Sequence, residues 1–553
     1  TASGNQNTAL GSQSLYNNAG AECTAVGYGA LNANTTANYN TAVGSESMEL
    51  NTTGTYNTAV GHKSLEANTT ANSNTAVGHE ALKANTTGAG NTGLGQTALA
   101  ANTTANYNVA VGYVALNANT TGAENTGIGT GALYANTTGG YNVGVGRNAL
   151  SANTTAAHNT AVGTECMKVS TTGHSNVGMG SQALITLTTG DSNVAIGYAA
   201  LNANTSADAN TAVGRSALGA NTTGSRNVAF GYGSLTTNTT ASYHVAVGYD
   251  ALGANTTGAA NIAIGDSALA LNTTGANNVA IGTFDGSTLP ALYDNTTGSF
   301  NVAVGNGALN NNTTASNNTA VGRVALAANT TGAGNTAIGQ SSMVDCTTGD
   351  ENTAIGNYSA ENVTTGGNNT ALGRSAGAAI QSGSNNIAVG YGADCAHDSG
   401  NSITMGVGIT GQGDNFKFGK ASNVVSNQFT SDANWARSSD ERIKQDIKED
   451  TLGLNFINDL KTITYRWKPS NEIPEEFNDY NEENQKDTEV VMHGMLAQEV
   501  KAALDTAGVD TFAGWSENDD GMQNISREMF VIPLIKAIQE LSAEVEQLKQ
   551  KAH

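Results

Sequence analysis

The stretch NTAVGHKSLEANTTANS, residues 57–73, is one copy of a 17-residue unit that fills most of this chain. Its consensus is N-T-A-V-G-x-x-A-L-x-A-N-T-T-G-x-x, and the glycine after the apolar pair marks the period. From Gly11 to Gly406 that glycine returns every 17 residues, except for a step of 16 at each end and one of 23 between Gly282 and Gly305. A strict period of this length predicts a stacked repeat fold rather than an ordinary globular domain.

Within the unit, N-[TV]-[AG]-[VIL]-G alternates with a period of two, which predicts a short strand. We expect the Val or Ile of this strand and the Leu of the A-L pair to point inward. The position between the two larger strand residues holds Ala59, Ala76, Gly93, Ala110 and Gly127 in successive units. This restriction to the smallest side chains predicts a close approach of another backbone. The N-T-T-G segment is typical of a turn.

No unit has enough apolar side chains to bury a core alone, so stacking must make the core continuous. Rungs of a β stack lie ~4.8 Å apart, so two dozen rungs predict a shaft roughly 110 Å long. Stacking also predicts an asparagine ladder, formed by Asn57, Asn74, Asn91, Asn108 and Asn125. A thin solenoid with a small-residue face is better buried against copies of itself, so we expect a parallel homotrimer; these residues alone also allow two chains.

The charge distribution divides the chain. Residues 431–553 contain 25 of the 45 acidic residues and 13 of the 23 basic residues. The preceding 430 residues contain only 20 acidic and 10 basic residues. The net charge of −22 argues against binding nucleic acid through a basic face. We expect a 17-residue β-repeat shaft over 1–406, a β transition over 407–437, and an α+β C-terminal module over 438–553. The fold class is therefore an all-β solenoid or β-roll followed by α+β.

The cysteines are far apart in the sequence and occupy repeat positions otherwise held by Asn or small residues, so we expect them to be reduced. They are Cys23, Cys166, Cys346 and Cys395. No apolar run reaches transmembrane length, and we expect no membrane insertion. The chain opens inside a repeat without an initiator Met, so we expect an N-terminal portion to precede Thr1.

The transition carries several large apolar anchors, namely Phe416, Phe418, Val424, Val425, Phe429 and Trp435. Near the C-terminus, Val531, Leu534, Ile538, Leu541, Val545 and Leu548 repeat at heptad spacing. This pattern predicts a short coiled coil over about 528–551, which would clamp the register of the chains.

Two families resemble parts of this chain. Units such as NTAVGHEALKANTTG (residues 74–88) resemble head repeats of trimeric adhesins and, more closely, repeat shafts of phage tail fibres. Residues 438–553 resemble the intramolecular chaperone of endosialidase-type tailspikes, also called the S74 peptidase family. The resemblance is carried by Ser439–Asp440–Glu441–Arg442–Ile443–Lys444 and by His493–Gly494–Met495–Leu496–Ala497–Gln498–Glu499–Val500.

The second resemblance implies that the module assembles three chains and then cuts itself off. It implies Ser439 as the nucleophile and Lys444 as the base, with Asp440, Arg442 and His493 in support. A lysine serves as a base only after desolvation lowers its pKa, so this dyad should work only in the closed trimer. The alternative is structural: Ser439 caps a helix, with the acidic residues at its positive end.

Two rows of variable repeat positions hold mainly aromatic and charged side chains, which are usually exposed. One row comprises Tyr28, His62, His79, Tyr113, Arg147, Tyr198, Arg215, Tyr232, Tyr249, Arg323 and Arg374; the other comprises Tyr39, Tyr56, Tyr107, Tyr141, Tyr243 and Phe300. Such rings stack on sugars or shield the strand ladder, and we favour shielding. His62 and His79 are only a weak metal candidate, and we expect no metal or other cofactor. The insertion Thr283–Leu292 is the better receptor candidate.

These features predict a structural and adhesive fibre, the distal part of a phage tail fibre located in the virion. Its partners would be its own copies, upstream virion components, and a glycan or protein receptor on the host. The alternatives are a polysaccharide-degrading tailspike and a bacterial trimeric adhesin at the cell surface. We expect no activity on external substrates, because the repeats show no clustered Asp/Glu pair for glycoside hydrolysis. The only expected chemistry is one self-cleavage.

Overall fold

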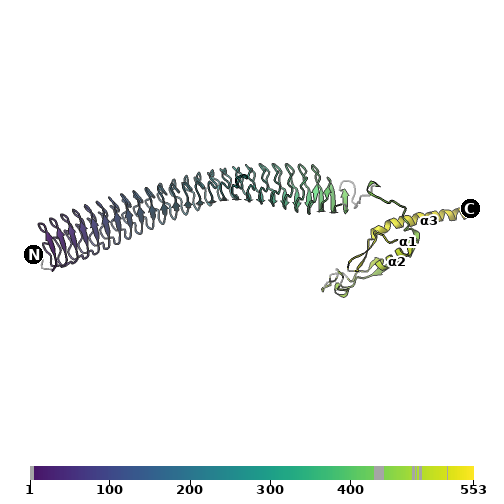
Figure 1. Ribbon diagram of the computed structural model, residues 1–553, viewed down its shortest axis with the longest axis horizontal. Coiled ribbons are helices and arrows are strands. Elements are labelled where there is room, and N and C mark those ends of the chain that lie inside the picture. Colours follow the sequence, from purple (N-terminus) through teal and green to yellow (C-terminus); the bar gives the residue numbers. More distant parts are fainter. Residues whose placement is uncertain are drawn as a thin grey trace. The chain divides into compact units, whose positions relative to one another are not determined.

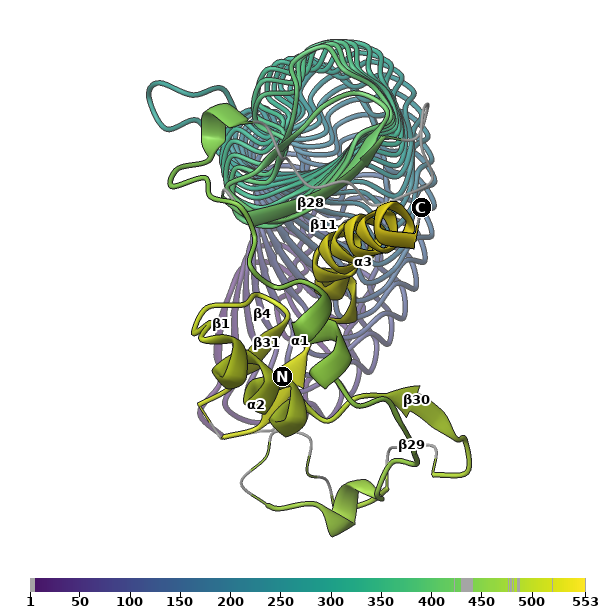
Figure 2. The same cartoon turned by 90° about the vertical axis from the view of Figure 1, so that its right-hand side faces the viewer.

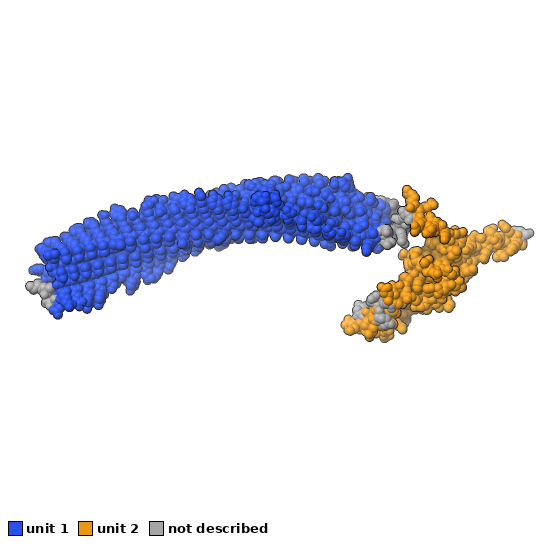
Figure 3. Space-filling view, in the orientation of Figure 1, with its two compact units in different colours: residues 1–437 blue, residues 438–553 orange. Residues whose placement is uncertain are grey.

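The computed structural model describes residues 5–421, 423–428, 441–475, 477, 480, 482–484, 488–519 and 521–552. The chain divides into two compact units, residues 1–437 and 438–553, which Figure 3 colours separately. The predicted fold class is confirmed, because the first unit is a β-solenoid and the second a small α+β fold. Among the described residues, no helix is both long and apolar enough to span a bilayer.

The first unit places one three-residue strand in each coil (Figure 1). In chain order these are β1 (Thr8–Leu10), β2 (Thr24–Val26), β3 (Thr41–Val43), β4 (Thr58–Val60), β5 (Thr75–Val77), β6 (Thr92–Leu94), β7 (Val109–Val111), β8 (Thr126–Ile128), β9 (Val143–Val145), β10 (Thr160–Val162), β11 (Val177–Met179), β12 (Val194–Ile196), β13 (Thr211–Val213), β14 (Val228–Phe230), β15 (Val245–Val247), β16 (Ile262–Ile264), β17 (Val279–Ile281), β18 (Val302–Val304), β19 (Thr319–Val321), β20 (Thr336–Ile338), β21 (Thr353–Ile355), β22 (Thr370–Leu372) and β23 (Ile387–Val389).

Each strand pairs in parallel with the next, and the register keeps equivalent repeat positions above one another, as in Val60 over Val77. The stack continues through β25 (Ile403–Val407) and β27 (Asn415–Lys420). It ends with β28 (Asn423–Gln428), which is antiparallel to β27. A separate parallel pair, formed by β24 (Asp394–Cys395) and β26 (Thr410–Gly411), lies next to β25. The 17-residue period is therefore one coil of a continuous parallel stack.

The extra residues of the 23-residue step do not interrupt the stack. Val279 of β17 still pairs with Val302 of β18, and the backbone N–H of Asn301 donates to Asn278 Oδ1 at 2.9 Å. Figure 2 shows a teal loop standing out from the outline of the coils where this insertion lies. In the loop, the Asp285 carboxylate accepts the N–H groups of Ser287 and Thr288. These bonds lower the pKa of Asp285 to about 2.

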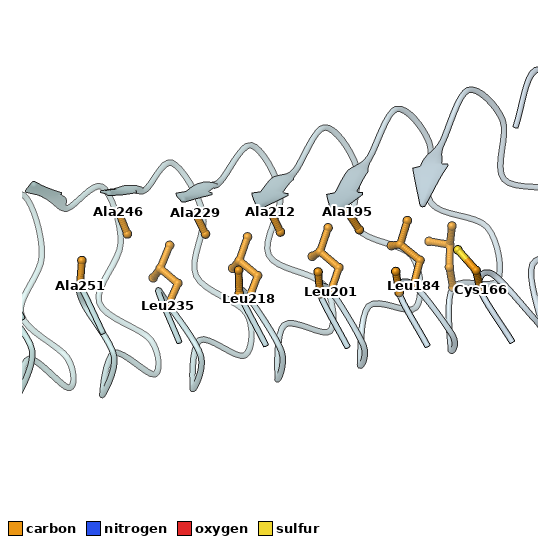
Figure 4. Packing of buried hydrophobic residues seen from close by; sticks show 14 of the residues in the cluster. Cys166, Leu184, Ala195, Leu201, Ala212, Leu218, Ala229, Leu235, Ala246 and Ala251 are labelled. Carbon is orange, nitrogen blue, oxygen red and sulfur yellow. The ribbon is translucent and has the colours of Figure 1, made fainter. Parts of the chain in front are cut away.

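The core reverses the predicted faces of the strand. The middle Ala or Gly is buried in every strand from β2 to β23, whereas the larger apolar residue after it lies on the outer surface, as Ala59 and Val60 illustrate. Figure 4 shows the strand alanines pointing at the leucines of the A-L pairs, such as Ala212 toward Leu218. Leucine fills this thin interior, so only a methyl group or less fits opposite it. The prediction that Val points inward was therefore wrong, and the prediction for Leu was right.

The close approach of neighbouring backbones falls on the glycine after the strand rather than on the middle residue. Gly163 has φ +138°, and a Cβ there would lie 2.5 Å from the carbonyl oxygen of Gly180. Such a φ is open essentially to glycine alone. The stack therefore needs this glycine in each coil for both its backbone conformation and its packing.

Two asparagine ladders run through the stack, of which the sequence predicted one. In the predicted ladder, the side chain bonds the backbone of the next coil: Asn159 Oδ1 accepts the N–H of Asn176 at 2.9 Å. The second ladder uses the Asn of N-T-T, where amide bonds amide, as in Asn153 Nδ2 to Asn136 Oδ1 at 2.7 Å. Ser170 and Leu187 interrupt this second ladder, which leaves the buried Asn153 Oδ1 without a hydrogen-bond partner among the described residues; the ladder resumes with Asn238 Nδ2 bonded to Asn221 Oδ1. It tolerates apolar residues, since Leu187 occupies one of its positions.

This difference predicts unequal effects of the same substitution in the two ladders. Asn159→Leu removes the acceptor of a buried backbone N–H, so the unfolding free energy should fall by about 2 kcal/mol. Asn153→Leu shortens the second ladder by one member and should cost less than about 1 kcal/mol. Thermal and denaturant unfolding, followed by circular dichroism, compares the two variants. Equal losses would contradict the assigned roles.

All four cysteines are free, as predicted, and all four are buried. They replace repeat residues in the interior: Cys166 takes an Ala position beside Met167, and Cys346 takes the Asn position of an N-T-T turn. Burial raises the pKa of the Cys166 thiol to about 12 and that of Cys346 to about 11. The thiols therefore stay protonated and fill space in the interior of the coils.

The second unit is built from short elements around a small aromatic core. In chain order these are η1 (Glu441–Ile443), α1 (Leu454–Asp459), β29 (Ile463–Tyr465), η2 (Ser470–Glu472), β30 (Met492–Gly494), α2 (Ala497–Ala507), β31 (Trp515–Glu517), β32 (Gln523–Ile525), η3 (Arg527–Phe530) and α3 (Val531–Ala552). β29 pairs with β30 and β31 with β32, each antiparallel. The predicted anchors Phe429 and Trp435 lie outside the described residues, whereas Phe416 and Phe418 are in contact on β27.

Helix α3 confirms the predicted C-terminal helix. Its heptad residues Val531, Leu534, Ile538, Leu541, Val545 and Leu548 are all exposed in the single chain. Pro533 and Ala537, on another side of the helix, are buried. The coiled coil itself stays a prediction, but its apolar seam is present and uncovered.

Candidate self-assembly and self-cleavage site

The chaperone-like motif residues 493–500 lie at a strand-to-helix junction of the second unit. His493 and Gly494 end β30, and Ala497 to Val500 form the first turn of α2. Val500 is buried in the core with Phe456 and Phe530, whose rings stack. The motif thus ties a strand and a helix to one core.

Crowding by neighbouring side chains explains why residue 494 is a glycine. A Cβ at this position would lie 3.1 Å from both an Arg527 guanidinium nitrogen and a ring carbon of Tyr465. Glu499 lies in the first turn of α2, where a negative charge is favourable, and one of its oxygens contacts Lys461 Nζ at 3.4 Å. The other Glu499 carboxylate oxygen is buried without a hydrogen-bond partner among the described residues.

A hollow of about 650 Å³ opens beside this junction. Its walls include the motif residues Met495, Leu496 and Gln498 together with Tyr465 and Arg527. The hollow therefore belongs to the surface that the motif builds. Its walls carry both apolar and polar groups, which suits packing against another polypeptide.

The segment that carries the proposed base lies at the start of the unit. Arg442 and Lys444 are exposed in the single chain, and the Lys444 backbone N–H donates to the carbonyl of Glu441 at 3.0 Å. Ser439 and Asp440, the proposed nucleophile and its neighbour, lie outside the described residues. His493 is also exposed, and its strand position pairs with Thr464.

This starting segment is anchored to helix α3. Lys536 Nζ forms an ion pair with Glu449 Oε1 at 2.6 Å, and the Glu540 carboxylate accepts the N–H of Leu454 at 2.7 Å. Sequence reasoning missed both contacts, because they join residues more than 80 positions apart. They link residues 449–454, which follow the proposed base in the sequence, to the helix that carries the heptad seam.

The exposed rows of the shaft stack along its axis. The rings of Tyr39 and Tyr56 lie 4.9 Å apart and nearly parallel, and Arg215 lies 5.7 Å from the rings of both Tyr198 and Tyr232. Neighbouring rungs therefore cover the ring faces, which agrees with shielding better than with sugar stacking. His62 and His79 are also adjacent, at 5.5 Å between ring centroids.

Stacking creates an acidic cluster, although the sequence had led us to expect no clustered Asp/Glu pair in the repeats. Glu46, Glu49 and Glu66 bring their carboxylates within 4.8 Å of one another. Glu49 and Glu66 are 17 residues apart, so the repeat spacing already carried the signal. Lys63 Nζ contacts Glu46 at 3.0 Å and Glu66 at 3.1 Å, and these bonds raise the pKa of Lys63. The cluster does not include His62 or His79.

Comparison with known families identifies the C-terminal segment. Residues 439–509 match the family described as chaperone of endosialidase, Peptidase_S74. The match begins at Ser439 and spans the motif at 493–500. No curated protein and no solved structure matches the chain.

The chain therefore carries an S74-type chaperone segment behind a β-solenoid of 17-residue repeats. This combination fits the architecture of tail fibres and endosialidase-type proteins.

Proposed function

We propose that this chain is the distal part of a trimeric phage tail fibre, which contacts the host surface and carries its own assembly chaperone. The observation that carries the proposal is the chaperone match that begins at Ser439, after the last solenoid strand, β28, in the sequence. The virion is the corresponding location. The partners are two further copies of the chain, upstream virion components, and a host glycan or protein receptor.

The regularity of the shaft explains why a chaperone is needed. Each coil repeats the last, so two shafts meet almost equally well after slipping by one rung of ~4.8 Å. Parallel association of long β-chains is also slow and prone to mispairing. A trimerising seed at one end removes this degeneracy, and the exposed seam of α3 is suited to that task.

Self-cleavage at or next to Ser439 completes the proposal. The Ser439 hydroxyl attacks the carbonyl carbon of the peptide bond that precedes it, while Lys444 takes the hydroxyl proton; the C–N bond then breaks, and Lys444 returns the proton to the Ser439 nitrogen as it leaves. Water hydrolyses the resulting ester, which leaves a carboxylate on Ser438 and restores the Ser439 hydroxyl. A lysine needs a desolvated site to act as a base, and Lys444 is exposed in the single chain. The missing burial must come from the other chains. Cleavage would therefore follow correct assembly.

Host contact is proposed at the insertion between β17 and β18. Its residue Phe284 is exposed, and the Asp285 turn holds the loop in shape. It interrupts the otherwise uniform surface of the shaft. A binding loop on a rigid scaffold is a common arrangement for recognition.

The test compares Ser439→Ala with the neighbouring control Ser438→Ala. We expect the unmodified chain and Ser438→Ala to yield separate shaft and C-terminal fragments by denaturing mass spectrometry after assembly. Ser439→Ala should remain one chain of full length. If all three stay full length under assembly conditions, or all three are cut, the proposed nucleophile is wrong.

A polysaccharide-degrading tailspike is the second candidate, and the Glu46–Glu49–Glu66 cluster is the observation that favours it. The Lys63 ion pairs occupy two of these carboxylates, which weighs against a free acid and base. Incubation with host surface polysaccharide should leave its length unchanged. Shortened product that disappears in Glu66→Gln would favour the tailspike.

A further inference from the structure

One face of the main sheet is apolar along the whole shaft. The third residue of each strand from β1 to β23, continued by Met405 and Phe418, forms what we call the outer row. Register pairs each member with the next, as in Leu372, Val389 and Met405. Every member is Val, Ile, Leu, Met or Phe. The sequence had suggested the Ala/Gly positions as the face between chains, but the structure buries them inside each coil.

No member of the outer row is buried in the single chain, and about half of them are exposed. Val60 is 36% exposed and Phe230 is 55% exposed. In Figure 4 the labelled strand alanines point into the coil, so the residues on either side of each alanine point away from it. The first residue of each strand, a Thr, Val or Ile, lies beside the outer row on the same surface.

Charge is absent from this face. None of the strands β1 to β23 contains Asp, Glu, Lys or Arg, although residues 1–430 carry 20 acidic and 10 basic side chains elsewhere. Stacked surface positions elsewhere in the same coils do carry charge, so stacking alone does not account for its exclusion from the strands. Depletion of charge is the mark of the core of an interface.

The size of the face matches a stable interface. Twenty-five rungs at ~4.8 Å and a strand width of roughly 10 Å give on the order of 1,000 Å² per chain. Standard interfaces bury about 800 Å² per partner, and monomers rarely expose apolar patches beyond a few hundred Å². The occupant must also be as long and as regular as the shaft. A further copy of the same chain meets that requirement at every rung.

We propose that the outer row is the surface along which identical chains pack in the fibre, parallel and with equal residues facing one another. This inference rests on the proposed trimer. Three identical chains joined around one threefold axis through the seam of α3 run parallel, and the outer row would then extend the same association along the shaft. Large members such as Met179 and Phe230 interrupt the uniform row and so favour one register.

Cysteine crosslinking tests the face and the register. Ile264→Cys places a thiol in the outer row, and Thr257→Cys places one on the exposed N-T-T turn of the same stack. The native cysteines are buried and so do not interfere. Assembled full chain is treated with a short bifunctional maleimide and resolved under denaturing conditions. We expect at least a tenfold higher yield of linked chains for Ile264→Cys than for Thr257→Cys.

Register is tested by co-expressing Ile264→Cys chains with tagged Ile196→Cys chains. Links should join chains of the same kind only, because the two positions are four rungs apart. Native mass spectrometry of the unlinked protein separates the possible failures. A single-chain mass would overturn the proposed trimer. A three-chain mass with no preference for Ile264→Cys, or with mixed links, would overturn only the outer row as the parallel, in-register interface.

Discussion

Gly163→Ala should lower the unfolding free energy of the shaft by about 4 kcal/mol or prevent its assembly. A Cβ at residue 163 would lie 2.5 Å from the backbone oxygen of Gly180 and 2.6 Å from its carbonyl carbon. A backbone atom of the next coil cannot move without disturbing the ladder beyond it. The φ of +138° adds strain, because side chains disfavour this conformation. Denaturant unfolding followed by circular dichroism measures the loss.

The control for this prediction is Gly29→Ala. Gly29 has φ +67°, and the nearest atom to a Cβ there is 3.8 Å away. The equivalent position of another coil already holds Ala199 at φ +55°. We therefore expect a cost of less than about 1 kcal/mol. Similar losses for Gly29→Ala and Gly163→Ala would show that close stacking at the strand-end glycine is not what the repeat requires.

His244→Asn should make the shaft more stable in acid, by about 3 kcal/mol near pH 4. His244 replaces an asparagine of the first ladder and is fully buried. Its Nδ1 accepts the backbone N–H of Asn261 at 3.1 Å, and its Nε2 faces the Asn255 amide nitrogen at 3.3 Å. Because Nδ1 accepts this bond, the neutral ring carries its proton on Nε2. Protonation of the ring would place a second N–H on Nδ1, directly against the N–H of Asn261.

The direction of the pH effect follows from the pKa. Burial lowers the pKa of His244 from 6.5 to about 4. Between these values the unfolded chain binds more protons than the folded one, so the folded state loses stability as the pH falls from about 6.5 to 4. A difference of about 2.5 pKa units corresponds to roughly 3 kcal/mol. An asparagine does not titrate, so the variant should lack this component.

Thermal unfolding at pH 7 and pH 4 measures the effect as a difference between variant and unmodified chain. The matched control is His158→Asn, because the His158 ring is exposed and stacks on Tyr141 at 5.0 Å. That control should follow the unmodified chain at both pH values. If His244→Asn does so too, the buried imidazole does not limit acid stability.

The sequence predicted the features that depend on spacing alone. Stacking at a fixed period places Asn57 over Asn74 whatever the shape of the coil, so the first ladder was predictable. The second ladder repeats with the same period, but substitutions such as Ser170 and Leu187 obscured it. Apart from Asn7 at the first coil, the asparagines of both ladders are buried inside the coils.

The orientation of the strand was not predictable, because alternation separates two faces without showing which one is inside. The Leu of the A-L pair takes the interior, so the Val of the strand is left outside. The backbone also adopts left-handed conformations at Lys63 (φ +58°) and Leu65 (φ +51°), where local preference disfavours them. There the N–H of Lys63 donates to the preceding coil and that of Leu65 to the following one. Only the stack supplies these partners.

For the candidate site, the sequence located the motifs but not their relation to α3. Ser439 and Lys444 were placed by resemblance, and their chemistry stays a prediction. The ion pair of Glu449 with Lys536 and the bond from Leu454 to Glu540 depend on tertiary packing. No local sequence pattern predicts contacts between residues so far apart in the chain.

The central claim is that this solenoid exists as three identical chains. Native mass spectrometry of the assembled full-length protein tests it most directly, with Ser439→Ala used to keep each chain intact. The expected mass is three times the 56.0 kDa of one chain. A mass of 56.0 kDa, at concentrations where the shaft is folded by circular dichroism, would contradict the account.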